Sequence, residues 1–216
     1  KPQLSENIGA CARAMKNFSF SKLIVIKPKP TFPNDKIIAT SVGAQEVIKK
    51  SKVYDTLEPA MKNIDYLIST TSRFRNKNIK HISLNQLSKI DFSKKIGFLF
   101  GSEASGLSNS EIVYANCTMQ IPTNPNFKSL NLSHSVIIVA QVVSSLIKLK
   151  RSNFKKSQKV KSASKKDIQS MINLCISQLE SKNFFKPPEK KPIMLENLRN
   201  IFYKMELSEK ETRILS

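Results

Sequence analysis

Short apolar runs rich in β-branched residues alternate with helical patterns along the first part of the chain. Each run is short enough to be a buried strand, and the segments between the runs carry apolar residues at helical spacing. Strands that alternate with helices are typical of an α/β fold with a parallel sheet. The predicted strands are 23–26, 66–68, 96–100 and 119–121, and the predicted crossover helices are 8–18, 44–50, 57–63 and 109–115.

A long, mostly apolar helix is predicted from Ser129 to about Lys150. Ser and Asn side chains at its start can cap the free amides of the first turn. This helix completes a first domain, residues 1–150. No apolar run in it approaches the roughly 18 to 20 residues that a bilayer span needs, so we expect a soluble protein without a membrane partner.

The segment after this helix is strongly basic. Residues 148–166 contain nine Lys or Arg and no acidic residue, a composition that buries too little apolar area to fold alone. We interpret residues 151–166 as a basic linker or an arm that touches RNA. Apolar stripes at helical spacing and a capping box at Ser208 and Glu211 then predict a small all-helical extension, residues 167–216.

The amino-acid composition indicates which class of partner the protein binds. The formal net charge is +20, and such a charge attracts polyanions, so nucleic acid or an anionic membrane is the expected partner. Lys outnumbers Arg by 30 to 6, a skew that compositional drift of a genome also produces. Charge alone therefore leaves both interpretations open.

The cysteines and histidines offer no metal site. Cys11, Cys117 and Cys175 are far apart and only two histidines occur, so we expect neither a disulfide framework nor a bound metal. A reducing cytoplasm fits three free cysteines. The chain opens at Lys1 without a start Met, so we expect that native N-terminal residues, including an initial strand, are absent.

Three segments contain most of the residues with candidate functional chemistry. The last of them is an irregular polar turn that runs directly into a helix, which is typical of a ligand site. They are 7–18 (NIGACARAMKNF), 100–107 (FGSEASGL) and 121–133 (IPTNPNFKSLNLS). Together, in this order, they resemble the signature of the SpoU-type SPOUT RNA 2′-O-methyltransferases, and within that family the TrmJ-type tRNA enzymes. The resemblance covers residues 2–150 well and 167–216 weakly.

The resemblance implies S-adenosylmethionine as cofactor, held largely by main chain in a trefoil knot near the end of the first domain. Glycines after a buried strand suit such a role, because without a Cβ they let the backbone come close to a ligand. Periodicity alone gives no support for a knot, since knots are rare. The cofactor-binding residues implied are Thr70, Thr71, Ser72, Gly101, Gly106, Ile121, Lys128, Ser129 and Leu130.

The methyl acceptor that the resemblance implies is a ribose 2′-hydroxyl. Its proton must leave as the oxygen attacks, so a base or a cation that stabilises the alkoxide is needed. The resemblance assigns that role to Arg13, with Asn7 fixing the loop, Glu103 orienting its neighbours, and Ser129 and Asn131 joining the last motif to the active site.

Two other residues invite a catalytic role. His134 lies one helical turn past Leu130, but a lone histidine is more often a packed or half-exposed helix residue. Cys11 lies among alanines with no histidine near it in sequence, so it is interpreted as a core cysteine.

The RNA contacts are assigned to two basic groups. Arg73 and Arg75 flank Phe74, an arrangement that can stack a single-stranded base or clamp a phosphate. In the basic segment, the expected contacts are Lys155, Lys156, Lys159 and Lys161.

Two classes of function remain at the level of sequence. The first is an enzyme that methylates a ribose 2′-hydroxyl of RNA, with modification of the tRNA anticodon loop favoured over ribosomal RNA by the resemblance. The second is a catalytically silent RNA-binding protein on the same fold. Retention of Asn7, Arg13, Glu103, Ser129 and Asn131 favours the enzyme. The resemblance also implies a homodimer, and the helix from Ser129 has more apolar positions than one face buries.

Overall fold

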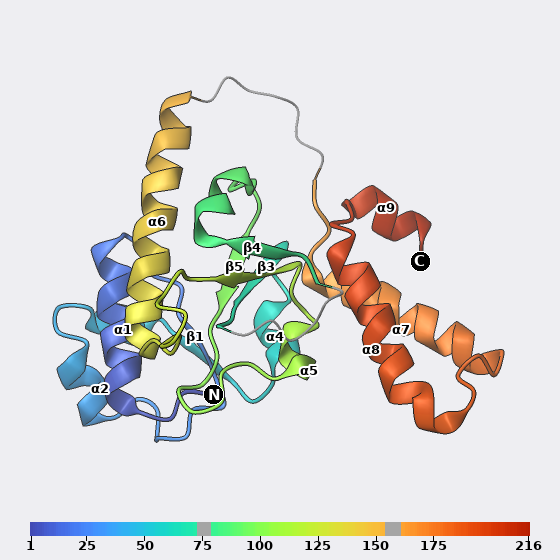
Figure 1. Ribbon diagram of the computed structural model, residues 1–216, viewed down its shortest axis with the longest axis horizontal. Coiled ribbons are helices and arrows are strands. Elements are labelled where there is room, and N and C mark those ends of the chain that lie inside the picture. The colour runs from blue at the N-terminus through green and yellow to red at the C-terminus, as the bar shows by residue number, and fades with distance from the viewer. Residues whose placement is uncertain (73–78, 154–160) are drawn as a thin grey trace.

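The computed structural model of the chain describes residues 1–72, 79–153 and 161–216, with strands and helices alternating first and helices alone at the end (Figure 1). The strands are β1 Ile24–Ile26, β2 Lys52–Tyr54, β3 Tyr66–Thr70, β4 His81–Ser83, β5 Ile96–Leu99 and β6 Cys117–Gln120. The α-helices are α1 Ser5–Asn17, α2 Asp35–Thr40, α3 Gln45–Lys49, α4 Leu57–Met61, α5 Asn109–Ile112, α6 Leu132–Asn153, α7 Lys165–Ser181, α8 Lys191–Lys204 and α9 Glu209–Ile214. Short 3-10 helices are η1 Leu84–Lys89 and η2 Pro188–Lys190.

All described strand pairs are parallel, and they form two sheets. One sheet has the order β1-β2 and the other the order β4-β6-β3-β5. The expected α/β class with a parallel sheet is thus confirmed, while the division into two sheets was not predicted. It leaves β1 and β5 each at a sheet edge.

The sequence pattern missed several short elements. The strands β2 and β4 have three residues each, too short for hydrophobic periodicity to register. The last strand was expected at 119–121, but β6 begins at Cys117 and ends at Gln120. Helix α2 was also missed. It is fixed locally by Asn34, whose side-chain Oδ1 accepts a hydrogen bond from the Ile37 amide at 3.0 Å.

Two of the apolar clusters in the first part of the chain are large. One lies between the four-stranded sheet and α6, where Ile68, Met119 and Val139 are buried. The other lies beneath α1 and contains Ile8 and Val25. A separate small cluster joins α1 to α6 through Cys11, Ala14 and Val136, and α1 also contacts α2.

The apolar stretch of helix α6 is longer than the sequence pattern predicted. Its Leu132–Leu149 stretch of 18 residues is apolar enough to cross a membrane by length and composition. This corrects the expectation that no run approaches that length. Core helices of soluble proteins have the same length and composition. Here one side of α6, with Val136, Val139 and Val143, packs against α1 and the sheet.

The C-terminal helices pack onto the edge of the first part through a buried lysine. Lys165 is fully buried, and its Nζ donates to Asn116 Oδ1 at 2.5 Å and lies 4.6 Å from the centre of the Tyr203 ring. The Asn116 amide in turn donates to the Tyr203 carbonyl at 2.6 Å, and Asn116 Oδ1 also accepts from the Leu67 amide of β3. The extension is thus tied directly to the start of two central strands.

Further contacts hold residues 161–163, at the end of the basic segment, against residues 207–209. The backbone of Ala163 donates to the Leu207 carbonyl, and Lys161 pairs with Glu209 at 2.6 Å. The Ser208 and Glu211 capping box is present at the start of α9, as predicted. The division into residues 1–150, 151–166 and 167–216 stays a prediction.

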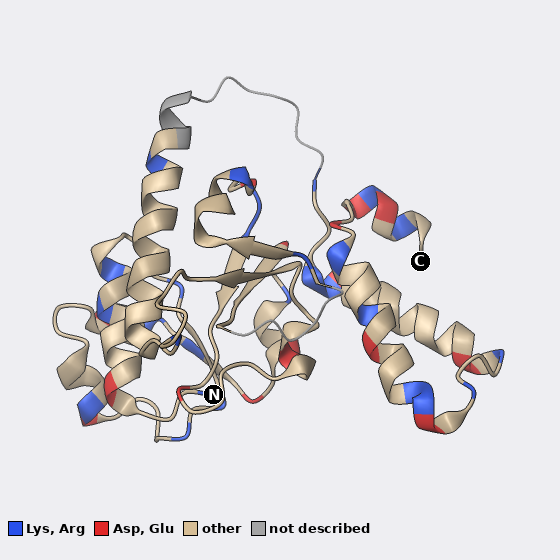
Figure 2. Cartoon of the chain, viewed as in Figure 1, with Lys and Arg blue, Asp and Glu red and all other residues tan. Residues whose placement is uncertain are grey.

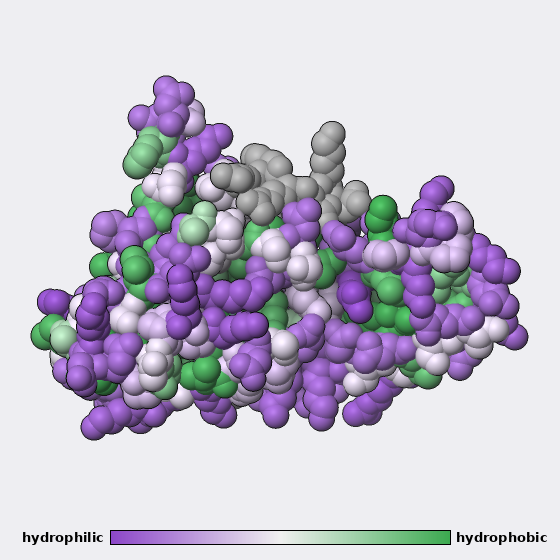
Figure 3. All heavy atoms as spheres, turned by 90° about the horizontal axis from the view of Figure 1, so that it is seen from below, coloured by the Kyte–Doolittle hydropathy of each residue, from purple (hydrophilic) through white to green (hydrophobic). Residues whose placement is uncertain are grey.

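Positive charge is spread over the molecule. Figure 2 shows Lys and Arg on strands, loops and helices of both parts of the chain, with acidic residues interspersed. Hydrophilic side chains also cover most of the face seen from below, and hydrophobic ones form separate patches (Figure 3). The charge is therefore available to a polyanion on many surfaces.

Candidate functional site

Three loops gather at one edge of the four-stranded sheet. Residues 71–72 follow β3, which ends at Thr70, residues 100–107 follow β5 and residues 121–131 follow β6. Because β3 pairs in parallel with both β5 and β6, the carboxyl ends of these strands lie side by side. Ligands of open α/β sheets bind outside the carboxyl ends of the strands, so this edge is the natural place for a site.

A chain of side-chain hydrogen bonds joins the three motif segments. The Asn7 amide of α1 donates to Glu103 Oε1 at 2.8 Å. The Asn131 amide donates to Asn7 Oδ1 at 2.9 Å. Segments that are 96 and 124 residues apart in sequence therefore meet at Asn7.

Local sequence explains why Asn131 and Asn7 sit where they do. Asn131 Oδ1 accepts the Ser133 amide at 2.8 Å, which satisfies a free donor in the first turn of α6. Asn7 is buried on the same side of α1 as Cys11 and Ala14, which pack against Val136 of α6. The packing of these two helices thus brings the two amide side chains together.

Glu103 is held as a carboxylate. Burial raises the pKa of its carboxyl, but the hydrogen bonds from Asn7 and from the backbone amides of Gln3 and Leu4 outweigh it and leave the pKa below its usual value. Those amides donate to Glu103 at 2.9 and 3.3 Å. A carboxylate that accepts several hydrogen bonds is stabilised in its charged form. Sequence reasoning missed Gln3 and Leu4, because backbone donors leave no signal in side-chain identity.

The loop after β5 requires its two glycines. A Cβ on Gly101 would meet the Gly106 carbonyl carbon at 2.3 Å and the Leu107 amide nitrogen at 2.5 Å. Gly106 has φ +68°, in the left-handed region that favours glycine. Its amide donates to the Ser102 carbonyl at 3.0 Å. The turn is tightly closed on itself and presents backbone at the sheet edge.

The loop after β6 is open to solvent. Lys128 and Ser129 are exposed, and Ile121 and Leu130 are half-buried. The amide of Phe127 donates to the Asn124 carbonyl at 2.9 Å, which closes a turn that ends at the exposed Phe127. After β3, Thr71 donates its amide to the Met119 carbonyl of β6, and Ser72 is exposed. The structure therefore brings the predicted cofactor residues to one edge, and their binding roles stay predictions.

Arg13 lies on the exposed side of α1. In the part of the chain that the structure describes, it makes no hydrogen bond or ion pair, and no arginine contacts Glu103. Its guanidinium is thus accessible to a ligand anion, and its assignment as the catalytic arginine is untested.

The predicted RNA contacts are described only in part. Arg73, Arg75, Lys155, Lys156 and Lys159 lie outside the described residues. Lys161 is described, and its exposed ammonium pairs with Glu209.

Cys11 and His134, the two other residues that the sequence offered as catalysts, are poorly suited to that role. Burial raises the pKa of the Cys11 thiol to about 12, with the Glu103 carboxylate adding to the effect, so no thiolate forms at neutral pH. His134 is exposed on α6. Over residues 1–72, 79–153 and 161–216, no three His, Cys, Asp or Glu side chains gather as a metal site would require.

Relatives of this chain are RNA methyltransferases by name. The tRNA (cytidine/uridine/adenosine-2′-O-)-methyltransferase TrmJ of Pseudomonas aeruginosa (strain UCBPP-PA14) is 28% identical over 97% of this chain and 86% of its own length. The tRNA (cytidine-2′-O-)-methyltransferase TrmJ of Sulfolobus acidocaldarius is 34% identical over 64% of this chain, which spans 60% of that relative.

Solved structures show the same architecture. The crystal structure of TrmJ from Z. mobilis ZM4 matches all of this chain and 92% of its own with a TM-score of 0.88 at 29% identity. The SpoU methyltransferase AviRb from Streptomyces viridochromogenes, crystallised with AdoMet, shares the fold with a TM-score of 0.56 at 18% identity over 71% of this chain and 59% of its own. The profile of the SpoU rRNA Methylase family matches residues 1–141. The family resemblance of the three motif segments is thereby confirmed, and the chain belongs to the SpoU rRNA Methylase family.

Proposed function

We propose that this protein is an S-adenosylmethionine-dependent methyltransferase that acts on a ribose 2′-hydroxyl of tRNA. The observation that carries the proposal is the hydrogen-bonded chain from Glu103 through Asn7 to Asn131. It unites the three motif segments at the sheet edge of a SpoU-family protein. Binding RNA does not by itself require this arrangement, so it favours the enzyme over a silent RNA-binding protein.

The loops fit a nucleoside-like cofactor. The turn at Gly101 and Gly106 presents backbone without side chains, and a flat, neutral adenine suits apolar walls with backbone hydrogen-bonding groups. Thr70, Thr71 and Ser72 on one side, and Ile121, Lys128, Ser129 and Leu130 on the other, would hold it. When bound, S-adenosylmethionine supplies an activated methyl group. We further propose that the segment from β6 into α6 forms the trefoil knot of the SPOUT fold.

Residues of this chain would prepare the ribose 2′-hydroxyl to accept the methyl group. Arg13, on the exposed side of α1 and without an ion-pair partner among the described residues, is suited to hold a substrate phosphate and to stabilise the alkoxide as the hydroxyl loses its proton. Asn7 and Glu103 fix the start of that helix, because the Glu103 carboxylate accepts hydrogen bonds from Asn7 within it and from the Gln3 and Leu4 amides just before it. Their role is to position Arg13 and the loops.

The site is proposed to work in a homodimer in the cytoplasm. Part of α6 is left without cover, with Ile137 exposed by 37% and Leu149 by 63%. A second copy packed on this helix would cover these side chains. Free cysteines and an RNA substrate both suit the cytoplasm.

The direct test is methyl transfer from labelled cofactor into purified tRNA and, separately, into ribosomal RNA. We expect label in tRNA, recovered after digestion as a 2′-O-methyl nucleoside. Label in ribosomal RNA alone would contradict the tRNA assignment. RNA binding without any label in either substrate would show a silent protein.

A further inference from the structure

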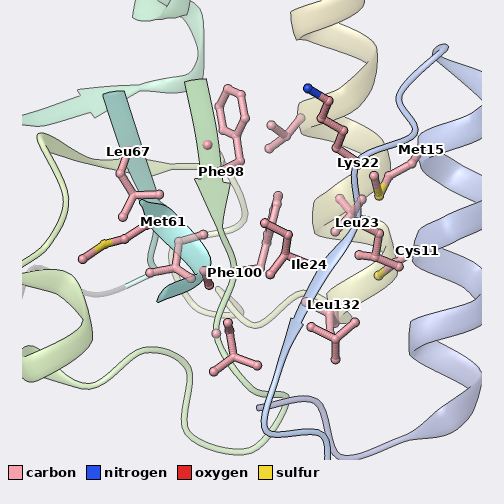
Figure 4. Close-up of a pocket in the computed structure, with 18 of the residues that line it drawn as sticks. Cys11, Met15, Lys22, Leu23, Ile24, Met61, Leu67, Phe98, Phe100 and Leu132 are labelled. Atoms are coloured by element: carbon pink, nitrogen blue, oxygen red, sulfur yellow. The ribbon is translucent and has the colours of Figure 1, made fainter. Parts of the chain in front are cut away.

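Phe127 is the most exposed aromatic side chain among the residues that the structure describes, at 73% exposure. It lies in the loop between β6 and α6 (Figure 1) and belongs to no apolar cluster of the described chain. It also fills no cavity that lies nearby. The space of about 770 Å³ between β1 and β5 is lined by Leu132 but by no residue of 121–131 (Figure 4). The ring is therefore displayed to solvent and contributes little to folding.

The backbone around this ring is fixed. The Phe127 amide donates to the Asn124 carbonyl at 2.9 Å, and the two residues form an isolated antiparallel bridge. The Asn126 amide donates to Asn124 Oδ1, also at 2.9 Å, and Pro125 between them has a restricted φ. A side chain held on such a turn loses less freedom when it binds a ligand. The sequence Asn-Pro-Asn thus builds a firm support for one exposed ring.

The surroundings of the ring are polar and basic. Residues 124–129 are all exposed, and Phe127 is flanked by Asn126 and Lys128. Lys128 pairs with no acidic side chain in the described part of the chain. From 112 to 166 the sequence has ten Lys or Arg and no Asp or Glu. An interface with another protein buries several apolar side chains together, whereas this ring stands among polar groups and positive charge.

The loop also borders both halves of the proposed site. Ser129, one of the predicted cofactor residues, comes two positions after Phe127. Asn131, four positions after it, donates its side-chain amide to Asn7 of α1, the helix that carries Arg13. The ring thus lies within a few residues of the segments where the methyl donor and the acceptor ribose are proposed to meet.

We propose that Phe127 stacks on an unpaired base of the substrate RNA, next to the ribose that is methylated, while the Lys128 ammonium neutralises a neighbouring phosphate. This proposal rests on the RNA substrate of the proposed function. Every base has a flat face on which an aromatic ring can stack, so the contact selects unpaired nucleotides and not a particular base. Bases inside a helix are already stacked on each other and offer no free face. The loop would therefore favour an RNA loop over an RNA helix.

The first test uses fluorescence. The chain has no tryptophan, so Phe127→Trp introduces a single indole at the proposed contact. Stacking on a base quenches indole emission, so a single-stranded RNA oligonucleotide should quench this emission as it binds. The same oligonucleotide annealed to its complement should have a much smaller effect, and so should heparin, a polyanion without bases. S-adenosylmethionine alone should leave the emission unchanged.

The second test separates stacking from apolar contact. Leucine is apolar but has no flat ring, so Phe127→Leu should weaken binding of the oligonucleotide about five- to a hundredfold. Phe127→Tyr keeps the ring and should retain most of the affinity. Because the side chain is exposed, both variants should keep the Tm and the affinity for S-adenosylmethionine. Both tests measure binding, so they stay decisive even if the protein transfers no methyl group.

Four results would overturn the proposal. Equal binding by Phe127→Leu and the native chain, or indole emission that bound RNA leaves unchanged, would remove the ring from the RNA contact. Equal quenching by the single strand and by its duplex or heparin would show an electrostatic effect without stacking. Quenching by S-adenosylmethionine alone would place the ring in the cofactor site. A blue shift of the emission that grows with protein concentration, without RNA, would show that a second copy covers Phe127.

Discussion

Asn7 and Glu103 are joined by a hydrogen bond of 2.8 Å that connects helix α1 to the loop after β5. Neither residue carries the positive charge that the proposed reaction needs. Together they fix the backbone on which that charge is displayed, and Asn131 extends the connection to the start of α6.

Replacing Glu103→Gln should lower methyl transfer at least about tenfold and destabilise the protein by about 1 to 2 kcal/mol. The Gln side chain has one acceptor oxygen in place of two, so it cannot accept from the Gln3 amide on one side and from the Leu4 and Asn7 amides on the other at once. Initial rates and thermal unfolding measure the two effects. Glu6→Gln, an exposed change on α1, is the control and should alter neither.

Replacing Gly101→Ala should weaken cofactor binding by about tenfold or more, because the added Cβ lies 2.3 Å from backbone and forces the turn to open. Calorimetric titration with S-adenosylmethionine measures this affinity. Ala104→Ser, an exposed change in the same loop, is the control. Equal affinity in both variants would remove the turn from the cofactor site.

Replacing Arg13→Ala should lower the rate of methyl transfer on the order of a hundredfold or more while cofactor affinity stays nearly unchanged. A cation that acts on the transition state typically contributes about 3 to 4 kcal/mol. Single-turnover rates and cofactor titration separate the two effects. Unchanged turnover would disprove the assignment of Arg13.

The free energy of unfolding should rise with pH between about pH 7 and 10, and Lys165→Met should flatten that rise. Burial lowers the pKa of Lys165 to about 7, with Cys117 and Glu206 opposing the shift. The unfolded chain then binds more protons than the folded one in this window, so folding gains up to about 1.4 kcal/mol for each pH unit. Below pH 7 both states hold the proton and the slope from this group vanishes.

Denaturant unfolding at a series of pH values measures this slope. Lys166→Met, at the exposed neighbouring position, is the matched control and should keep it. A slope that persists in Lys165→Met would assign the effect to another group.

Neutral replacement of Lys155, Lys156 and Lys159 should weaken RNA binding and reduce the dependence of log affinity on log salt. The expected reduction is about 0.7 to 0.9 for each RNA phosphate that these lysines no longer neutralise. Lys161→Gln alone should do little, because that ammonium already pairs with Glu209. Filter binding at several salt concentrations measures the slope. An unaltered slope in the triple variant would exclude this segment from the RNA interface.

The polar residues at the sheet edge could be predicted from sequence because they lie within short motifs. Asn7, Glu103 and Asn131 were assigned through the family resemblance of the motifs that contain them, and the structure brings these three residues into hydrogen-bond contact. The split of the sheet could not be predicted, since the pattern does not say which strands pair.

The burial of Lys165 also could not be predicted from the sequence. In a basic run such a lysine is expected to be solvated. Partners far away in sequence make its burial tolerable: Asn116, Tyr203 and the Tyr114 carbonyl, which are 49, 38 and 51 positions away. Long-range partners of this kind leave no local signal.

The distance in sequence between the bonded residues has a consequence for folding. The bond from Asn7 to Glu103 closes a loop of 96 positions, and the bond from Asn131 to Asn7 closes one of 124. Contacts of such high order form late and slow the search for the native state. During refolding, helices should therefore appear in circular dichroism well before activity returns. The delay between the two signals would measure how late the sheet edge assembles.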